Sequence, residues 1–282
     1  MKLINSSYEI LEQGAGLQGI YEQIERVGKT CYKSEVKGGE SAEKFVDKMI
    51  ANQHYAMLEH GTVYLRFPNM SPSGTPEMSI LCGNPYTRWI LTTRDGNGTY
   101  YTLVTTNLRV LVENRLFEWA KAFICEPTED HIKRVTVRFI TDRGVSHELV
   151  RHRVFSFAQE STRYCNYSKD KFGNELTFIE PTWYDEAEPV IKSSFESFLK
   201  YSEDAYLDLL DHQYTPQQAR QVLPNALKTE ICMTGFVDST GWIHFFDLRA
   251  LDKTGPAHPD MKALACPLYA EFCQRGYIGN SN

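Results

Sequence analysis

Cations and hydroxyl groups lie close together in the segment 151–164 of this chain. Arg151, His152 and Arg153 are consecutive, and the segment continues through Ser156, Gln159, Ser161, Arg163 and Tyr164. Arginine presents a planar fork of N–H donors that matches a phosphate group, and serine hydroxyls add short hydrogen bonds to phosphate or ribose oxygens. The segment therefore predicts a site for a nucleotide-sized anion. The alternative is a solvated basic surface paired with nearby carboxylates such as Glu148 and Glu160.

The rest of the chain is acidic, and this limits what the anion can be. The formal net charge is −6 at pH 7. A protein that binds a nucleic acid polymer neutralises many phosphates with Lys and Arg, so a nucleic-acid-binding module is disfavoured and a mononucleotide fits better.

The seven Cys form no repeated C-x-x-C pattern, which is typical of reduced thiols in a cytoplasmic protein. No signal-peptide core and no apolar run of membrane-spanning length is present, so we expect a soluble cytoplasmic protein that binds no membrane.

Amphipathic spacing predicts several helices. It occurs over 17–27, 42–50 and 107–123, and the longest helix is expected to follow Pro189. In that helix the apolar residues fall on one face up to His212: Val190, Ile191, Phe195, Phe198, Leu199, Tyr206, Leu209 and Leu210. Pro216 either ends this helix or begins the next one.

The segments 62–67, 86–93, 100–105 and 135–140 are rich in β-branched and aromatic residues and predict strands. The turn residues 95–98 predict a hairpin between two of them. Because strands and helices mix without regular alternation, the fold class is α+β, with a mixed or antiparallel sheet packed against long helices. Residues 1–282 are interpreted as a single elaborated domain.

Three short patterns suggest other chemistry and are given structural interpretations. Residues 14–19 match G-x-G-x-x-G, but no strand ending in an acidic residue follows, which favours a turn ahead of a helix. His147 and His152 are five residues apart, which places their side chains on different helix faces, so no metal site is predicted. Cys266-Pro267 lacks the spacing of a zinc motif or the setting of a cysteine nucleophile, and each Cys is interpreted as a small apolar residue.

The order R-H-R-x-x-S-x-x-x-x-S-x-R-Y in 151–164 resembles the signature of the flavin-dependent thymidylate synthases. The resemblance continues in the family's order through most of the chain, at His54 with 58–60, then 219–224, 244–250 and 257–259. It implies an enzyme that methylates dUMP to dTMP with FAD as cofactor, methylenetetrahydrofolate as carbon donor and NADPH as reductant. It also implies a homotetramer whose sites are shared between subunits. Relative to short members of the family, about 68–134 is interpreted as an insertion that carries a hairpin and a helix.

The resemblance also implies the site residues. Those for dUMP are Glu148, Leu149, Val150, Arg151, Gln159, Glu160, Ser161, Thr162, Arg163, Arg220 and Arg249. Those for FAD are Ala56, Arg151, His152, Arg153, Gln159, Asp238, Ser239, Thr240 and His244. Arg249 is the predicted catalytic residue, because a cation beside the uracil ring stabilises the enolate-like charge that develops there. Its alternative role is an exposed Arg that ends a helix.

Four positions depart from the family's common pattern. Ala158-Gln159 replaces Asn-Glu, Glu148 stands where some members have Gln, Ala56 replaces a Ser or Thr, and Asp238 replaces a frequent Asn. The charge of Asp238 would lie near the cofactor unless a cation offsets it. Ala56, Ala158 and Asp238 leave open a nucleotide-binding regulatory protein of the same fold that has lost flavin chemistry.

Several neighbouring residues have two possible roles. His54 and His244 are open between flavin contact and packing, whereas His60 is expected to be structural. Phe155, Phe157 and Tyr164 are expected to pack beneath the arginine cluster.

Overall fold

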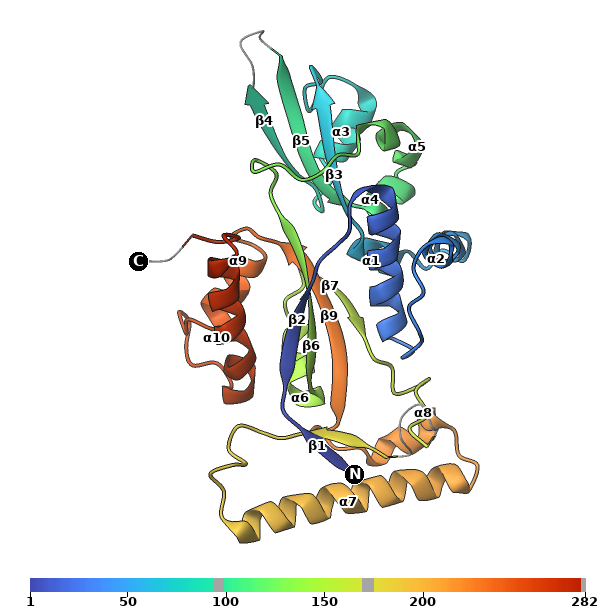
Figure 1. Ribbon diagram of the computed structural model, residues 1–282, viewed down its shortest axis with the longest axis vertical. Helices are drawn as coiled ribbons and strands as arrows, with labels where there is room; N and C mark the ends of the chain where they lie inside the picture. The colour runs from blue at the N-terminus through green and yellow to red at the C-terminus, as the bar shows by residue number, and fades with distance from the viewer. Residues whose placement is uncertain (94–98, 169–174, 280–282) are drawn as a thin grey trace.

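The centre of the molecule, in the computed structural model, is a four-stranded antiparallel sheet (Figure 1). The structure describes residues 1–93, 99–168 and 175–279. In spatial order the strands are β2 (Ser7–Leu11), β6 (Arg134–Asp142), β9 (Lys228–Phe236) and β7 (Ser156–Gln159).

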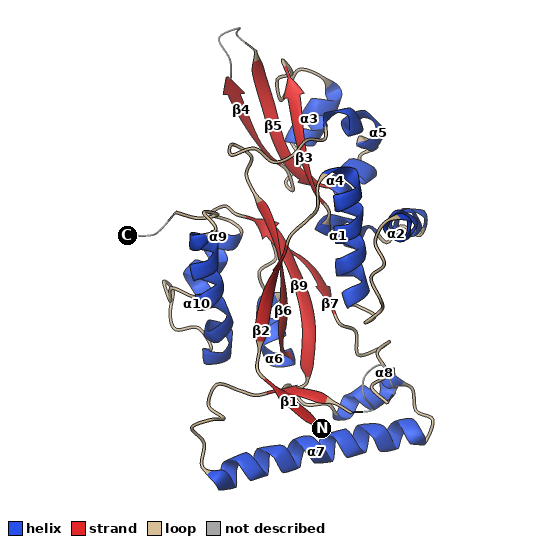
Figure 2. Ribbon diagram, in the orientation of Figure 1, coloured by secondary structure: helices blue, strands red, loops and turns tan. Residues whose placement is uncertain are grey.

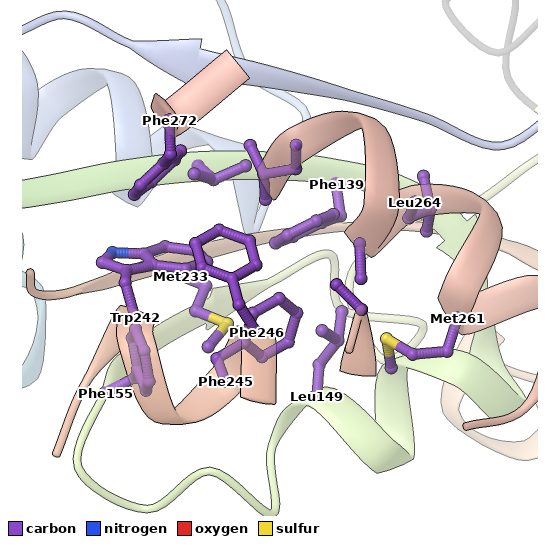
Figure 3. Close-up of a cluster of buried hydrophobic side chains, with 14 of the residues drawn as sticks. Phe139, Leu149, Phe155, Met233, Trp242, Phe245, Phe246, Met261, Leu264 and Phe272 are labelled. Carbon is purple, nitrogen blue, oxygen red and sulfur yellow. The ribbon is translucent and has the colours of Figure 1, made fainter. Parts of the chain in front are cut away.

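Helices cover both faces of this sheet because successive strand residues alternate between them. Ile231 and Met233 of β9 belong to the main core, whereas Cys232 between them packs with Val27 on the opposite face. The main core is closed by α6 (Arg143–Leu149), α9 (Trp242–Arg249) and α10 (Pro259–Gln274), and the opposite face by α1 (Gly16–Thr30). Figure 3 shows the aromatic residues of α9 between the sheet and α10, and the Trp242 and Phe272 rings have centroids 5.1 Å apart.

A second sheet and its helices form a lobe at one end of the molecule (Figure 2). Its strand order is β3-β5-β4, all antiparallel. The elements are α2 (Glu40–Ala51), the 3-10 helix η1 (Tyr55–His60), β3 (Thr62–Pro68), α3 (Pro76–Cys82), β4 (Arg88–Thr93), β5 (Tyr100–Asn107), α4 (Leu108–Glu113), α5 (Phe117–Ala120) and η2 (Lys121–Phe123). This lobe has its own buried core, which includes Ile24 of α1 and Leu65 of β3.

The other end of the molecule is crossed by the long helix α7 (Pro189–Asp211). The remaining elements lie near it: the parallel pair β1 (Lys2–Ile4) and β8 (Thr177–Ile179), α8 (Pro216–Ala219) and the 3-10 turn η4 (Arg220–Val222). Pro216 begins α8, where its missing N–H costs nothing.

The predicted α+β class and the predicted strands are confirmed, and so are the helices over 17–27, 42–50 and after Pro189. The single helix predicted over 107–123 is wrong. Helix α4 ends at Glu113, because Arg115 has a φ of 58°, which is incompatible with a continuing helix. Leu116, only 3% exposed, then packs into the lobe core before α5 begins. The predicted turn at 95–98 lies outside the described residues, although the strands on either side of it pair antiparallel.

The apolar face predicted for α7 is only partly buried. Leu199 and Tyr206 are fully buried. Val190, Ile191 and Phe198 are 66%, 51% and 57% exposed. This end of the molecule therefore leaves a row of large apolar side chains in contact with solvent.

The G-x-G-x-x-G match is a turn ahead of α1, as predicted. Gly16 begins the helix with a φ of 62°, and a Cβ at Gly19 would lie 1.9 Å from the Gly14 carbonyl oxygen. Glycine is required at position 19 by this close backbone approach. No helix in the described residues combines the length and the apolar character needed to cross a membrane.

Candidate functional site

Helix α6 presents chemically different residues on two neighbouring faces. Asp142 begins it by accepting a hydrogen bond from the Val145 N–H at 2.8 Å. Arg143 and His147 are four residues apart and share one face, and Gly144 and Glu148 share the next. Each face lines its own pocket.

Arg249 is held beside the Glu148 face. It is the last residue of α9, and its Nη1 donates to Glu148 Oε2 at 3.0 Å while its Nε donates to His152 Nε2 at 3.1 Å. Burial, together with the neighbouring positive charge of Arg249 and the nearby His244, lowers the pKa of His152 to about 4. His152 is therefore neutral at pH 7 and can accept the Arg249 hydrogen bond. Two partners on separate segments fix the guanidinium in place.

The other face of α6 lines a basic pocket of about 300 Å³. Arg143, His147, Thr162 and Arg220 contribute to its wall. Arg220 donates to Thr162 Oγ1 at 3.4 Å, and the Arg143 side chain makes no ion pair within the described residues. Within the part of the chain that the structure describes, neither Arg143 nor Arg220 pairs with a carboxylate, and two such arginines are suited to an anion.

Arg143 and His147 were not among the predicted site residues. The signal that could have found them is helical spacing counted back from Glu148, since residues one and five positions earlier lie on adjacent faces. That signal is usable only once α6 is known to begin at Arg143, directly after β6.

A second pocket of about 320 Å³ lies on the Glu148 side of α6. Glu148, Trp183, Phe195 and His258 contribute to its wall, and Asn225 lines both pockets. A basic recess and a recess with aromatic walls thus lie next to each other. This combination is suited to a ligand with an anionic end and a flat ring.

The segment 159–163 leads from β7 to the basic pocket. Gln159 Nε2 donates to Ser146 Oγ at 2.9 Å and to Thr229 Oγ1 at 3.2 Å. Ser161 is held by its backbone N–H, which donates to the Cys31 carbonyl at 3.0 Å. The side chain of Arg163 is exposed, and its Nε donates to Gln217 at 3.2 Å.

Glu160 is not brought to either pocket. Its carboxylate is buried, accepts from Tyr167 Oη and Lys228 Nζ at 2.9 Å each, and lies 3.8 Å from Lys33 Nζ. Lys33 and Lys228 also pair with Glu230. Glu160 therefore anchors the start of the segment 160–163 to the sheet. The carboxylates considered as alternative partners of the arginine cluster, Glu148 and Glu160, are engaged by Arg249 and by lysines instead.

The segment 149–153 divides between core and solvent. Leu149 and His152 are buried, and the His152 ring meets the Phe245 ring of α9 edge-on, with centroids 5.0 Å apart. Val150, Arg151 and Arg153 are exposed. Neither arginine has an ion-pair partner within the described residues.

The turn before α9 carries Asp238, Ser239 and Thr240. Asp238 Oδ1 accepts from the backbone N–H of Thr240 and of Gly241, at 2.9 and 2.8 Å, so the carboxylate shapes the turn. Asp238 Oδ2 accepts from Arg88 Nε at 2.8 Å. Ser239 and Thr240 are exposed, as is His244 one turn into α9.

The predicted residues of η1 have contrasting surroundings. His54 and Ala56 are exposed, and η1 lies beside β7. His60 is fully buried and shares a 2.6 Å hydrogen bond with Thr234, which confirms its structural role. Burial lowers the pKa of His60 to about 3.

Two of the three aromatic residues expected beneath the arginine cluster contribute to packing. Phe155 is buried against Trp242, with centroids 4.9 Å apart, and Phe157 packs at the edge of the same core. Tyr164 lies beneath the Arg163 guanidinium, 5.4 Å from the ring centroid, but it is 60% exposed and meets Tyr32 on the surface instead of packing in the core. Cys165 and Cys232 are fully buried and the other cysteines half-buried.

The charges of the predicted FAD residues fit a flavin dinucleotide. Its diphosphate needs cations that no protein carboxylate already neutralises, and Arg151 and Arg153 meet that requirement within the described residues. The one carboxylate in the predicted cofactor set, Asp238, is neutralised by Arg88. No group of metal-ligating side chains is found in the described part of the chain.

Comparison with known proteins supports the family that the sequence resembles. The model of the thymidylate synthase complementing protein family matches residues 130–275, about half of the chain. Curated relatives include flavin-dependent thymidylate synthases of Geobacter sulfurreducens, 37% identical over 123 residues, and of Corynebacterium aurimucosum, 34% identical over 131 residues. Each match covers 44% of this chain, and 49% and 51% of the relative, so the chain spans about half the length of these relatives.

Among solved structures, the UMP/dUMP methylase PolB of Streptomyces cacaoi matches with a TM-score of 0.45 and 14% identity, covering 97% of this chain and 93% of that one. The segment matched by the family model contains α6, the arginine cluster, Arg220 and Arg249. Because that match spans half of the chain and includes these residues, the protein belongs to the thymidylate synthase complementing protein family, as its resemblance to flavin-dependent thymidylate synthases implied.

Proposed function

We propose that this protein is an FAD-dependent thymidylate synthase that methylates dUMP to dTMP, with methylenetetrahydrofolate as carbon donor and NADPH as reductant. The observation that carries the proposal is the position of Arg249, held by Glu148 and His152 on one side of α6 while an uncompensated arginine pocket lies on the other. The names of the curated relatives support the same activity.

In this proposal the basic pocket binds the dUMP phosphate. Arg143 and Arg220 supply the charge, and Thr162, Ser161 and Arg163 add hydrogen bonds from the segment beside them. Uracil lies toward Arg249. Gln159 and the backbone of 148–151 border the nucleotide, and Glu160 contributes through the position it gives to that segment.

Arg249 stabilises the charge that develops on the pyrimidine ring when its carbon attacks the one-carbon unit. Glu148 and His152 keep the guanidinium from rotating, so no reorientation is needed as the charge appears. His152 does this as a neutral acceptor, since its pKa of about 4 is far below pH 7.

FAD, when bound, supplies the redox chemistry that reduces the transferred carbon to a methyl group. Arg151 and Arg153 would hold its diphosphate. Asp238, Ser239, Thr240 and His244 would border it from the start of α9, together with Gln159 and the backbone at Ala56. Neither arginine is used in another ion pair within the described residues, which supports this assignment.

We also propose that the active assembly is a homotetramer. The exposed apolar side chains of α7 support self-association, because contiguous exposed apolar patches are uncommon on monomers. Sharing of each site between subunits would explain why Arg151, Arg153 and Arg163 are exposed in a single chain.

The test is an anaerobic absorbance titration with FAD, repeated with dUMP and then NADPH. Wild-type protein is expected to bind FAD, to change the flavin spectrum on addition of dUMP, and to lose flavin absorbance with NADPH. A variant with Arg151→Ala and Arg153→Ala should bind FAD weakly, whereas Arg66→Ala, which removes an exposed arginine stacked on Tyr101, should match wild type.

Absence of flavin binding at high micromolar FAD would contradict the synthase and favour the regulatory alternative. Binding of FAD without any response to dUMP would instead indicate a different flavin enzyme.

A further inference from the structure

Arg88 links two parts of the molecule that are distant in sequence. It is the first residue of β4 in the lobe, and it reaches the turn between β9 and α9. Its Nε donates to Asp238 Oδ2 at 2.8 Å, and its Nη2 donates to Thr240 Oγ1 at 3.2 Å. The guanidinium also lies over the Phe236 ring, 4.6 Å from the centroid.

The lobe holds this guanidinium in one orientation. Its Nη1 donates to the carbonyls of Pro85 and Thr87 at 3.0 and 3.1 Å. Those carbonyls belong to a turn that Asn84 shapes by accepting from the Tyr86 N–H at 2.9 Å. Donors on all three guanidinium nitrogens are thus used in a planar arrangement that a lysine ammonium cannot reproduce.

Asp238 needs this cation because its own turn is half-buried. The side chain is 18% exposed, and the hydrogen bonds from Thr240 and Arg88 hold the pKa of its carboxyl below the usual value even though burial opposes that shift. The carboxylate is therefore charged at neutral pH. Without Arg88 this charge would stand uncompensated beside Ser239 and Thr240.

We propose that Arg88 is a positioning residue for the flavin, supplied by the lobe: it neutralises Asp238 and fixes the turn 238–240, so that this turn accepts the polyanionic cofactor. The inference rests on the proposed flavin function. It goes further in assigning control of cofactor affinity to a residue outside the segment 130–275 that the family model matches.

The test is a double-mutant cycle read by FAD affinity, measured as flavin fluorescence quenching, so activity is not required. Arg88→Gln removes the cation but keeps a donor and should weaken FAD binding on the order of tenfold, because one carboxylate would then repel the diphosphate at short range. Asp238→Asn removes the charge but keeps an amide oxygen that can still accept from the Thr240 and Gly241 N–H groups, so its FAD affinity is the reference for the double variant.

The combination Arg88→Gln with Asp238→Asn should return to within about threefold of Asp238→Asn alone, because no charge remains to be neutralised. The loss in Arg88→Gln should also shrink as salt is raised from 0.05 to about 0.5 M. Arg66→Ala in the same lobe serves as the matched control and should leave FAD affinity unchanged.

Three results would overturn the inference. The first is FAD binding by Arg88→Gln equal to that of wild type. The second is a failure of Asp238→Asn to restore binding to Arg88→Gln while the thermal midpoint of the apo-protein is unchanged, because the loss would then not come from the Asp238 charge. If wild-type protein binds no FAD, the proposed function and this inference fail together; in the first two cases the proposed function stands.

Discussion

Arg249 and Glu148 each lie in the last turn of a different helix and meet in one ion pair, with Nη1 and Oε2 3.0 Å apart. The partial negative charge at the end of α9 favours an arginine there, and Glu148 then sets its direction. The side chains are 19% and 27% exposed, so the pair borders solvent and can be reached by a ligand. The protein itself therefore holds the guanidinium in one orientation.

The first prediction concerns Arg249 itself. Arg249→Ala is expected to abolish dTMP formation while sparing NADPH oxidation by oxygen, because in the proposed function this residue acts on the pyrimidine and not on the flavin. The loss of one oriented cation facing developing charge corresponds to about 3 to 4 kcal/mol, or roughly a hundred- to thousandfold in rate. Arg249→Lys should restore little, since an ammonium cannot contact Glu148 and His152 in the same way. Unchanged dTMP formation in Arg249→Ala would remove this residue from the mechanism.

The second prediction concerns the basic pocket. Arg143→Ala and Arg220→Ala should each weaken dUMP binding by roughly ten- to a hundredfold, the value of one charge-assisted hydrogen bond. Isothermal titration with dUMP measures this, and deoxyuridine, which lacks the phosphate, should bind wild type and both variants alike. Equal losses for deoxyuridine and dUMP would show that these arginines do not contact phosphate.

The third prediction is a pH dependence of stability. His152 has a pKa near 4 in the folded protein and an ordinary value of 6.5 when unfolded. Below pH 6.5 the unfolded chain takes up a proton that the folded protein takes up only near pH 4, so stability falls as pH falls across this window. His152→Gln, which can still accept from Arg249, should show a smaller decrease in urea midpoint between pH 7 and pH 4.5.

The control for this experiment is His54→Gln, which removes an exposed imidazole and should keep the wild-type decrease. His60 contributes in the same direction, because its pKa is also lowered, to about 3. Some acid dependence should therefore remain in His152→Gln. An unchanged slope in that variant would mean that His152 is not the group responsible.

The fourth prediction concerns sharing of sites between subunits. Arg163→Ala and Arg249→Ala, each inactive alone, should complement when co-expressed, because mixed oligomers would contain sites that draw one intact residue from each chain. With random mixing of two chains, about a quarter of the sites would be restored. Mixed oligomers verified by native mass spectrometry that show no activity above the parents would place both residues in one chain's site.

Secondary structure was predictable wherever one pattern ran without interruption. Residues 135–140 alternate in a way that only a strand can bury on two faces, and the apolar spacing after Pro189 continued long enough to specify α7. The segment 107–123 was not predictable in the same way. Its spacing is helical throughout, but the positive φ of Arg115 and the burial of Leu116 are set by the lobe core, which contains residues distant in sequence.

The candidate site also has features that the sequence predicts and features that only the tertiary structure decides. Residue order alone identified the arginine cluster, Arg249 and the family, because short motifs are preserved in the sequence itself. The tertiary structure decided which charges are compensated. It engaged Glu160 with lysines, paired Glu148 with Arg249, and left Arg143 without an ion-pair partner in the described chain.

The sequence by itself thus determined the fold class, the family and the residue types available for binding an anion. Only the tertiary structure decided that Arg88 neutralises Asp238 across 150 positions of sequence, and that α6 turns Arg143 and Glu148 toward different pockets. The physical reason is that hydrogen bonds and ion pairs act over a few ångströms. Their partners are therefore fixed by packing between elements, which local sequence patterns do not encode.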